Sequence, residues 1–292
     1  MSRLAITVTR SANISPGLIF SMMPIAANEP VRTLHRYGYS VPSRWGSAFD
    51  GAVSEMLEPR SIADSVPHSV ERDASGEPPV DVVSRLEALH LPLEVFWPKG
   101  ARAAVVFVSG DGGWADLDRG VATGLAARGI AVVGWNTLRY FWKEKTPSGF
   151  AVDLAHVVGA LPADVTVFAG GYSFGAETVP IVVAGATDPA LQRIAGLTLL
   201  APGPYATFEV SPLDWLRKSE KPNEHAVAAA IDHAARPVLC LAPDDDAGSG
   251  CPPRGGSGYT RATFPGGHHF GADYDGLASR IASFIATDLG RR

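Results

Sequence analysis

Short apolar segments alternate with amphipathic segments from about residue 102 to residue 288 of this chain of 292 residues. Apolar runs of this length are typical of strands that are buried on both faces of a sheet. Strands that alternate with helices imply βαβ units, so the sequence predicts a three-layer α/β fold with a mostly parallel sheet. The predicted strands are 102–108, 130–135, 165–169, 196–200, 237–241 and 259–264, and the predicted helices are 116–128, 147–161, one ending near 186, and 273–288.

Two sequence signals refine this outline. Thr146 and Pro147 are residue types preferred at a helix N-cap and at the first helical position, so they mark the start of the second helix. The connection 202–236 is longer than usual, and we expect it to form a small cap with a helix at about 223–235. Its aromatic side chains, Phe208 and Trp215, either line a pocket or pack internally.

The chain before residue 89 has a different character. Residues 1–27 combine two arginines with a short apolar stretch that ends in small residues, as a secretory signal does. Residues 28–88 have no sustained period of 2 or 3.6 and contain scattered Pro, Ser, Gly and Asp, which is typical of a poorly ordered linker. We therefore expect the α/β domain to span 89–292.

Composition excludes two classes of protein. The formal net charge is −5, so there is no overall basic field to hold a nucleic acid. No apolar run reaches the roughly 18 residues needed to cross a bilayer, so we do not expect a transmembrane protein.

The sequence Gly-Tyr-Ser-Phe-Gly at 171–175 fits the pattern G-x-S-x-G. It follows a predicted strand and precedes a predicted helix, which is the context in which such a serine acts as a nucleophile. The turn is sharp and its flanking positions must be small, as Gly171 and Gly175 are. Ser173 is therefore the candidate nucleophile, at the carboxyl edge of the sheet.

A serine nucleophile needs a histidine base and a carboxylate that orients the base. In α/β hydrolases these residues follow in the order serine, acid, histidine. The fifth predicted strand ends in three aspartates, of which Asp246 is favoured over Asp245 as the acid. The sixth ends in paired histidines, of which His268 is favoured over His269 as the base. The spacing required of a metal site is missing, so we expect no metal and no cofactor.

A glycine-rich loop at 109–114 follows the first predicted strand. In a hydrolase this loop supplies one backbone N–H to the oxyanion hole, and the residue after the nucleophile supplies the other. The predicted donors are Phe174 and either Asp111 or Gly110. The spacing is not that of a dinucleotide- or phosphate-binding loop.

Four separated motifs resemble those of the bacterial virulence protein family VirJ/AcvB. They are Ser-Gly-Asp-Gly-Gly-Trp-Ala-Asp-Leu-Asp at 109–118, Leu-Arg-Tyr-Phe-Trp at 138–142, the serine motif at 171–176 and Gly-Gly-His-His-Phe at 266–270. The resemblance covers about 89–292 and implies an α/β-hydrolase fold, a periplasmic location and hydrolysis of aminoacyl-phosphatidylglycerol, typically the lysyl ester. It places Ser173 at the family's nucleophile. Glu177 and Pro243 depart from the family pattern, where Asp and Gly are expected.

The loop at 109–114 also contains the candidate substrate-binding residues, Asp111 and Trp114. A lysyl head group is cationic, so Asp111, Asp116 or Asp118 either binds its ammonium groups or caps the helix that follows. Arg139 either meets the lipid phosphate or forms a structural ion pair.

The two cysteines, Cys240 and Cys251, flank the predicted acid loop. We expect a disulfide between them, which is consistent with export to an oxidising compartment. The partner predicted for the chain is then a phospholipid head-group ester at a membrane surface. The alternatives are a general carboxylesterase or acyl-lipid hydrolase, and a non-catalytic accessory protein that binds secretion-system components.

Overall fold

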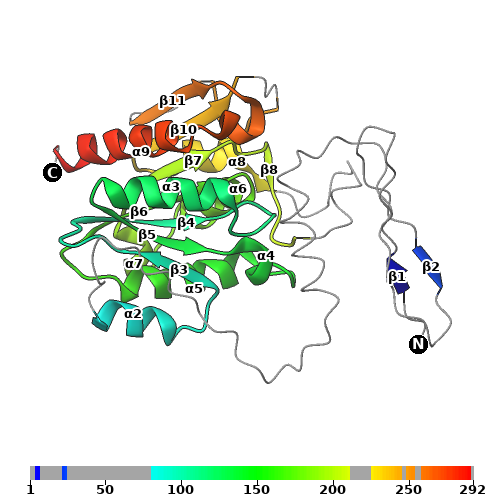
Figure 1. Ribbon diagram of the computed structural model, residues 1–292, viewed down its shortest axis with the longest axis horizontal. Helices are drawn as coiled ribbons and strands as arrows, with labels where there is room; N and C mark the ends of the chain where they lie inside the picture. The colour runs from blue at the N-terminus through cyan, green and yellow to red at the C-terminus, as the bar shows by residue number, and fades with distance from the viewer. Residues whose placement is uncertain are drawn as a thin grey trace. The chain divides into compact units, whose positions relative to one another are not determined.

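The computed structural model describes residues 4–6, 22–24, 80–210, 225–244, 248–253 and 258–290 (Figure 1). The chain divides into two units, Met1–Ser65 and Val66–Arg292. In the first unit, β1 (Leu4–Ile6) and β2 (Met22–Pro24) form an antiparallel pair. Both strands fall within the segment expected to be a signal, and most of the expected linker lies outside the described residues.

A seven-stranded sheet forms the centre of the second unit. Its neighbouring strands are parallel except for β3, which pairs antiparallel with β5 at one edge. The order is β11 (Tyr259–Phe264), β10 (Val238–Pro243), β7 (Ile194–Leu200), β6 (Thr166–Tyr172), β4 (Ala103–Val108), β5 (Ile130–Trp135) and β3 (Leu93–Phe96). The predicted mostly parallel sheet is confirmed, and the edge strand β3 was not predicted.

Helices cover both faces of this sheet. The face packed on α3 (Asp116–Ala127) and α9 (Tyr274–Leu289) lies opposite the face packed on α2 (Val80–Glu87), α5 (Pro147–Ala160) and α7 (Pro189–Gln192) (Figure 1). Helices α6 (Phe174–Val183) and α8 (Val227–Asp232) contribute to the second of these cores. Among the described helices, none is both long enough and apolar enough to cross a membrane.

Alternation along the strands explains the two cores. In β4, Ala104, Val106 and Val108 pack on the side of α5 and α6, whereas Ala103, Val105 and Phe107 pack on the side of α3 and α9. Every residue of β4 is buried. A strand with both faces covered has no polar side, which is why its sequence is a continuous apolar run.

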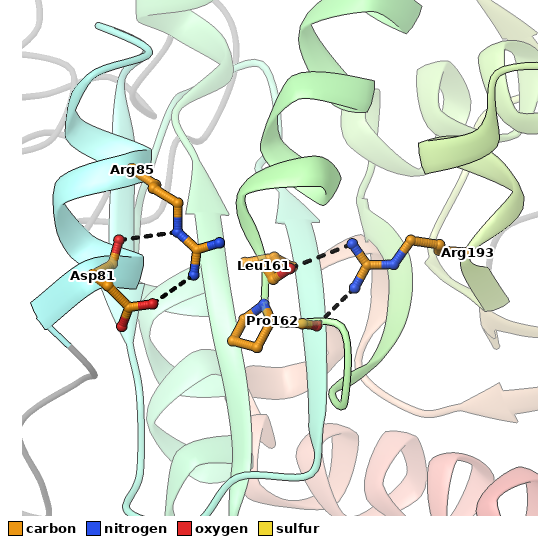
Figure 2. A network of polar contacts seen from close by, with 5 residues as sticks. All are labelled: Asp81, Arg85, Leu161, Pro162 and Arg193. Atoms are coloured by element: carbon orange, nitrogen blue, oxygen red, sulfur yellow. Dashed lines mark hydrogen bonds and ion pairs between the residues drawn. The ribbon is translucent and has the colours of Figure 1, made fainter.

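The ends of α5 are held by polar contacts. At the start, the hydroxyl of Thr146 accepts a hydrogen bond from the Gly149 N–H at 3.0 Å, which confirms the predicted N-cap. At the end, the Arg193 guanidinium donates to the Val158 carbonyl in the last helical turn. It also donates to the carbonyls of Leu161 and Pro162 just after the helix (Figure 2). Figure 2 also shows α2, where Arg85 pairs with Asp81.

Two regions differ from the prediction. Helix α2 lies inside the range 28–88 that was assigned to the linker, and its Val82 and Leu86 are buried in the core, so the folded unit begins before residue 89. The short strands β8 (Tyr205–Ala206) and β9 (His225–Ala226) pair in the expected cap, and α8 follows them.

The sequence left open whether the two aromatic residues of the cap line a pocket or pack internally. Phe208 is 6% exposed, and its ring packs against Phe141, Phe150 and His225, so it has a packing role. Trp215 lies outside the described residues.

Cys240 and Cys251 form the predicted disulfide, with 5.8 Å between their Cα atoms. Cys240 belongs to β10, and Cys251 follows the loop that begins at the carboxyl end of that strand. The bridge therefore closes the chain around the loop that contains the three aspartates.

Candidate active site

Ser173 occupies a strained turn between β6 and α6. Its φ is 49° and its ψ is −115°, values that a residue other than glycine seldom adopts. The Ser173 N–H donates to the Leu200 carbonyl of the neighbouring strand at 2.8 Å. A Cβ atom on Gly171 or Gly175 would lie 2.1 or 2.0 Å from the Val108 carbonyl oxygen, so only glycine fits at either position.

His268 is the histidine that reaches the serine. Its Nε2 lies 3.0 Å from the Ser173 Oγ, although the two residues are 95 positions apart in the chain. His268 belongs to the short helix η2 (Gly267–Ala272) that follows β11. A Cβ on Gly266, whose φ is 97°, would lie 2.2 Å from the Gly271 nitrogen, so the tight turn that presents His268 requires glycine there. This distance permits direct transfer of the hydroxyl proton to His268.

His269 has a different partner, the phenol of Tyr172. Its Nδ1 lies 2.8 Å from the Tyr172 hydroxyl oxygen. Burial lowers the pKa of His269, the neighbouring His268 lowers this pKa further, and Asp111 opposes the change. Burial, with the carboxylates of Asp118 and Asp111, raises the pKa of Tyr172 far above its ordinary value.

The protonated phenol of Tyr172 is therefore the donor to His269 Nδ1. In a neutral imidazole the hydrogen then lies on Nε2. The sequence left His268 and His269 open as the base, and the structure brings His268 to Ser173.

The two candidate acids, Asp245 and Asp246, lie outside the described residues. The preceding residue, Asp244, ties the acid loop to the histidine turn. Its N–H donates to the Phe264 carbonyl at 2.9 Å, and its Oδ1 accepts from the Gly267 N–H at 3.5 Å. The acid loop thus starts directly beside the turn that presents His268.

The loop after β4 lies against the nucleophile turn. A Cβ on Gly110 would be 3.0 Å from the Tyr172 ring and 3.8 Å from the Ser173 Cβ. The loop is fixed by buried hydrogen bonds: the Thr137 N–H donates to the Ser109 hydroxyl at 3.0 Å, and the Thr137 hydroxyl donates to the Ser109 carbonyl at 2.8 Å.

A buried carboxyl group, that of Asp118, lies behind the loop. It is 1% exposed, and the Ala115 N–H donates to its Oδ2 at 3.0 Å. Burial raises the pKa of Asp118 to about 7, and the amide groups of Ala115, Asp118 and Gly110 oppose the rise. The sequence left Gly110 and Asp111 open as the oxyanion donor of this loop, and both lie in the segment that packs against the nucleophile turn.

The second candidate donor is the Phe174 N–H, at the first residue of α6. The first N–H groups of a helix have no carbonyl partner within it, so they are available to an anion.

Trp114 does not have the substrate-binding geometry expected from the sequence. Its indole is 9% exposed and packs over Gly134, where a Cβ would lie 2.2 Å from the ring. The Phe107 ring meets it edge to face, with centroids 6.3 Å apart. The structure therefore gives Trp114 a packing role. The sequence suggested this role only because Trp114 is close to the oxyanion loop. Its contact with Gly134 of β5, the strand next to β4, could not be predicted from the residues around Trp114.

Glu177, one helical turn after the nucleophile, joins two parts of the site. Its backbone N–H donates to the Ser173 carbonyl, and its Oε1 accepts from the Gly203 N–H, both at 3.0 Å. Burial raises the pKa of Glu177 to about 8, the Gly203 N–H opposes this, and Asp111 adds to it. In the sequence, Glu177 stands out only as a departure from the family pattern.

The titration of Glu177 predicts a pH dependence of stability. A carboxyl whose pKa is about 8 in the folded chain and 4.5 without these contacts keeps its proton on folding, so its contribution to stability decreases as pH rises between those values. The pKa of Asp118 is also raised, to about 7, so Asp118 likewise lowers the stability of the folded chain as pH rises to about 7. The change in stability above pH 7 therefore comes mainly from Glu177.

In the Glu177→Gln variant, we expect the free energy of unfolding to change less between pH 7 and pH 8.5 than in the wild-type protein. Urea unfolding at several pH values measures this, with Glu144→Gln as the exposed control. Equal slopes in wild type and Glu177→Gln would contradict the assignment.

Among the described residues, no three side chains of His, Cys, Asp or Glu are grouped as metal ligands. The site consists of a serine in a strained strand–helix turn, a histidine after the last strand and a glycine loop after β4. A mostly parallel sheet with these features defines an α/β-hydrolase fold.

Comparison with known proteins identifies the family of the chain. The family model described as bacterial virulence protein (VirJ) matches residues 102–288, and the chain belongs to this family. A search of curated proteins found no match.

Three solved structures are similar to the chain at low sequence identity. TT1662 from Thermus thermophilus is 16% identical, with a TM-score of 0.51, 70% of this chain covered and 96% of the other. Est1E from Butyrivibrio proteoclasticus is 14% identical, with a TM-score of 0.48 and coverage of 68% and 94%. Rv0554 from Mycobacterium tuberculosis is 15% identical, with a TM-score of 0.49 and coverage of 68% and 93%.

Proposed function

We propose that this protein is a serine hydrolase that cleaves the aminoacyl ester of aminoacyl-phosphatidylglycerol, with lysyl-phosphatidylglycerol as the first substrate to test. The observation that carries the proposal is the contact of 3.0 Å between Ser173 Oγ and His268 Nε2 at a strained turn. A binding protein has no need to hold a serine in such a conformation, whereas a nucleophile gains exposure and alignment from it.

The reaction follows from the positions of these groups. His268 takes the Ser173 proton as Oγ attacks the ester carbonyl, and the N–H groups of Phe174 and Asp111 bind the resulting oxyanion. The intermediate collapses, the C–O bond to the glycerol breaks, and His268 returns the proton to the departing phosphatidylglycerol. Water, activated by His268, then releases the amino acid and restores Ser173. Asp246, or Asp245 in its place, orients His268.

Negative potential at the site supports a cationic substrate. The Asp111 carboxylate is close enough to raise the pKa of Glu177, which lies one turn after the nucleophile. It also opposes the lowering of the pKa of His269. An aminoacyl ester carries an α-ammonium group, and a lysyl ester carries a second cation. We therefore assign Asp111 a part in attracting these groups.

The Cys240–Cys251 disulfide supports a periplasmic location. Disulfides persist in oxidising compartments and are rare where thiols are kept reduced. Alkylation of thiols in the protein taken directly from cells tests this: we expect no label on either cysteine until a reductant is added.

The test of the proposed function is the release of lysine from lysyl-phosphatidylglycerol in detergent micelles. We expect the wild-type protein to release lysine and the Ser173→Ala variant to release none above background. Reaction of the folded protein with a fluorophosphonate is measured in parallel. Labelling without lysine release would replace the proposed substrate with another ester, as for a general carboxylesterase. A protein that is folded but shows neither would instead fit an accessory protein that only binds.

A further inference from the structure

An exposed tryptophan lies among cations in the segment that follows β5. Trp142 is 44% exposed, while its neighbour Phe141 is fully buried. Arg139 and Lys143 are exposed beside it. The Lys145 ammonium lies over the Tyr140 ring, 4.6 Å from its centroid. The chain as a whole has a net charge of −5, so a segment with three cations and one anion, Glu144, departs from the average surface.

This segment leaves the sheet at the same edge as the nucleophile. Val108 at the end of β4 pairs in register with Trp135 of β5 on one side and with Gly171 of β6 on the other. The Phe141 ring packs on the Phe174 ring at 4.9 Å between centroids, and Phe174 follows the nucleophile directly. The chain beside Trp142 is therefore held close to the nucleophile turn, and the Trp142 side chain is exposed there.

The conformation of the segment is held by backbone hydrogen bonds to the connection that follows β7. The Val210 N–H donates to the Phe141 carbonyl at 3.0 Å, and the Lys145 N–H donates to the Phe208 carbonyl at 2.8 Å. The same connection exposes a second aromatic residue, Tyr205, which is 51% exposed. Two exposed aromatic side chains and three cations thus stand at the carboxyl edge of the sheet.

We propose that the Trp142 surface, formed by Arg139, Trp142, Lys143, Lys145 and Tyr205, docks the protein on an anionic phospholipid bilayer. Tryptophan and tyrosine are enriched where a bilayer meets water, because their rings sit at the depth of the head groups. Lysine and arginine close to an anionic leaflet are attracted to it, by roughly fivefold in binding for each cation. An anionic bilayer matches both the charge and the aromatic character of this surface.

Docking in this way would hold the mouth of the site against the lipid surface. The proposal deepens the proposed function and rests on it for its biological use, because an ester in a lipid head group is reached only at the bilayer surface. Binding itself needs no catalysis, so it is measured on Ser173→Ala protein, and its result is independent of whether lysine is released.

The experiment is co-sedimentation of Ser173→Ala protein with vesicles. One set contains phosphatidylglycerol and phosphatidylcholine in equal amounts, and the other contains phosphatidylcholine alone. We expect binding to the anionic vesicles only. Adding Trp142→Ala or Lys143→Glu should weaken this binding by about fivefold or more. The matched controls are Leu289→Ala, at the exposed last residue of α9, and Lys99→Glu, at an exposed position before β4, and both should bind as the parent does.

Two further measurements keep the test decisive. Circular dichroism establishes that each variant is folded. In the otherwise wild-type protein, Trp142→Ala and Lys143→Glu should hydrolyse a water-soluble p-nitrophenyl ester at the parental rate. No binding to either vesicle, equal binding to both vesicle types, or equal weakening by the control variants would overturn the proposal. Loss of vesicle binding with full hydrolysis of the soluble ester would support it.

Discussion

Replacing Ser173 by alanine should lower kcat for ester hydrolysis by a factor of about 10⁴ or more. The reason is that the Oγ atom 3.0 Å from His268 Nε2 is the only nucleophile in the proposed first step. Water attacking in its place would keep the help of the oxyanion hole but lose covalent catalysis. Hydrolysis of a p-nitrophenyl ester and of lysyl-phosphatidylglycerol measures the loss, which should be the same for both substrates.

Stability should change little in this variant, because alanine tolerates the φ of 49° at position 173 about as poorly as serine does. Thermal unfolding of the variant separates lost chemistry from lost folding. Ser148→Ala serves as the matched control, since Ser148 is exposed near the start of α5. A Ser173→Ala protein that is folded and retains more than a tenth of the activity would refute the role of Ser173 as nucleophile.

The parts of the fold that could be predicted from sequence are those with a strong local signal. Strand β11 was predicted at 259–264 and lies there, and β4 differs by one residue from its predicted start. Burial on both faces makes β4 a continuous apolar run, which a sequence shows directly, whereas β11 lies at the edge of the sheet and its residues are partly exposed. The Thr146 cap was equally visible, because a hydroxyl followed by proline at a helix start is a local feature.

Features that depend on packing between distant segments could not be predicted. The edge strand β3 has four residues, and it is defined by its pairing with β5 rather than by its own sequence. His268 was favoured over His269 from the sequence, but its contact with Ser173 depends on the turn that follows the histidines, where Phe270 has a φ of 54°. The role of Trp114 depends on Gly134 in a different strand. Adjacent residues on the chain gave no information about any of these contacts.

The two histidines should respond differently to substitution. His268→Asn should lower kcat by a factor of about 10³ or more, since it removes the base. His269→Gln should cost about tenfold or less, because His269 contacts Tyr172 rather than Ser173. Kinetics on a water-soluble ester measures both variants. Equal losses would contradict the separate roles of the two histidines, and a larger loss in His269→Gln would assign the base to His269.

Tyr172→Phe tests how the neutral state of His269 is maintained. The phenol donates to His269 Nδ1, which accepts a hydrogen bond only in the neutral ring, so removing the hydroxyl should raise the pKa of His269. Burial and the neighbouring His268 would still lower this pKa. The ring centroids of His268 and His269 are 5.6 Å apart, so a charge on His269 would oppose formation of the His268 imidazolium during attack by Ser173. Asp111 faces His269 as well and would reduce this effect without reversing its sign.

The expected result is a loss of kcat in Tyr172→Phe that is larger at pH 6 than at pH 8. At pH 8 the ring of His269 is neutral with or without the phenol, and the variant should approach the wild-type rate. A role confined to packing would instead lower kcat by the same factor across the range. A pH profile of kcat for the two proteins therefore distinguishes an electrostatic role of the Tyr172–His269 pair from a purely structural one. The hydrogen bond from Tyr172 occupies His269 Nδ1, so His269 lies beside the base without competing with it for the proton of Ser173.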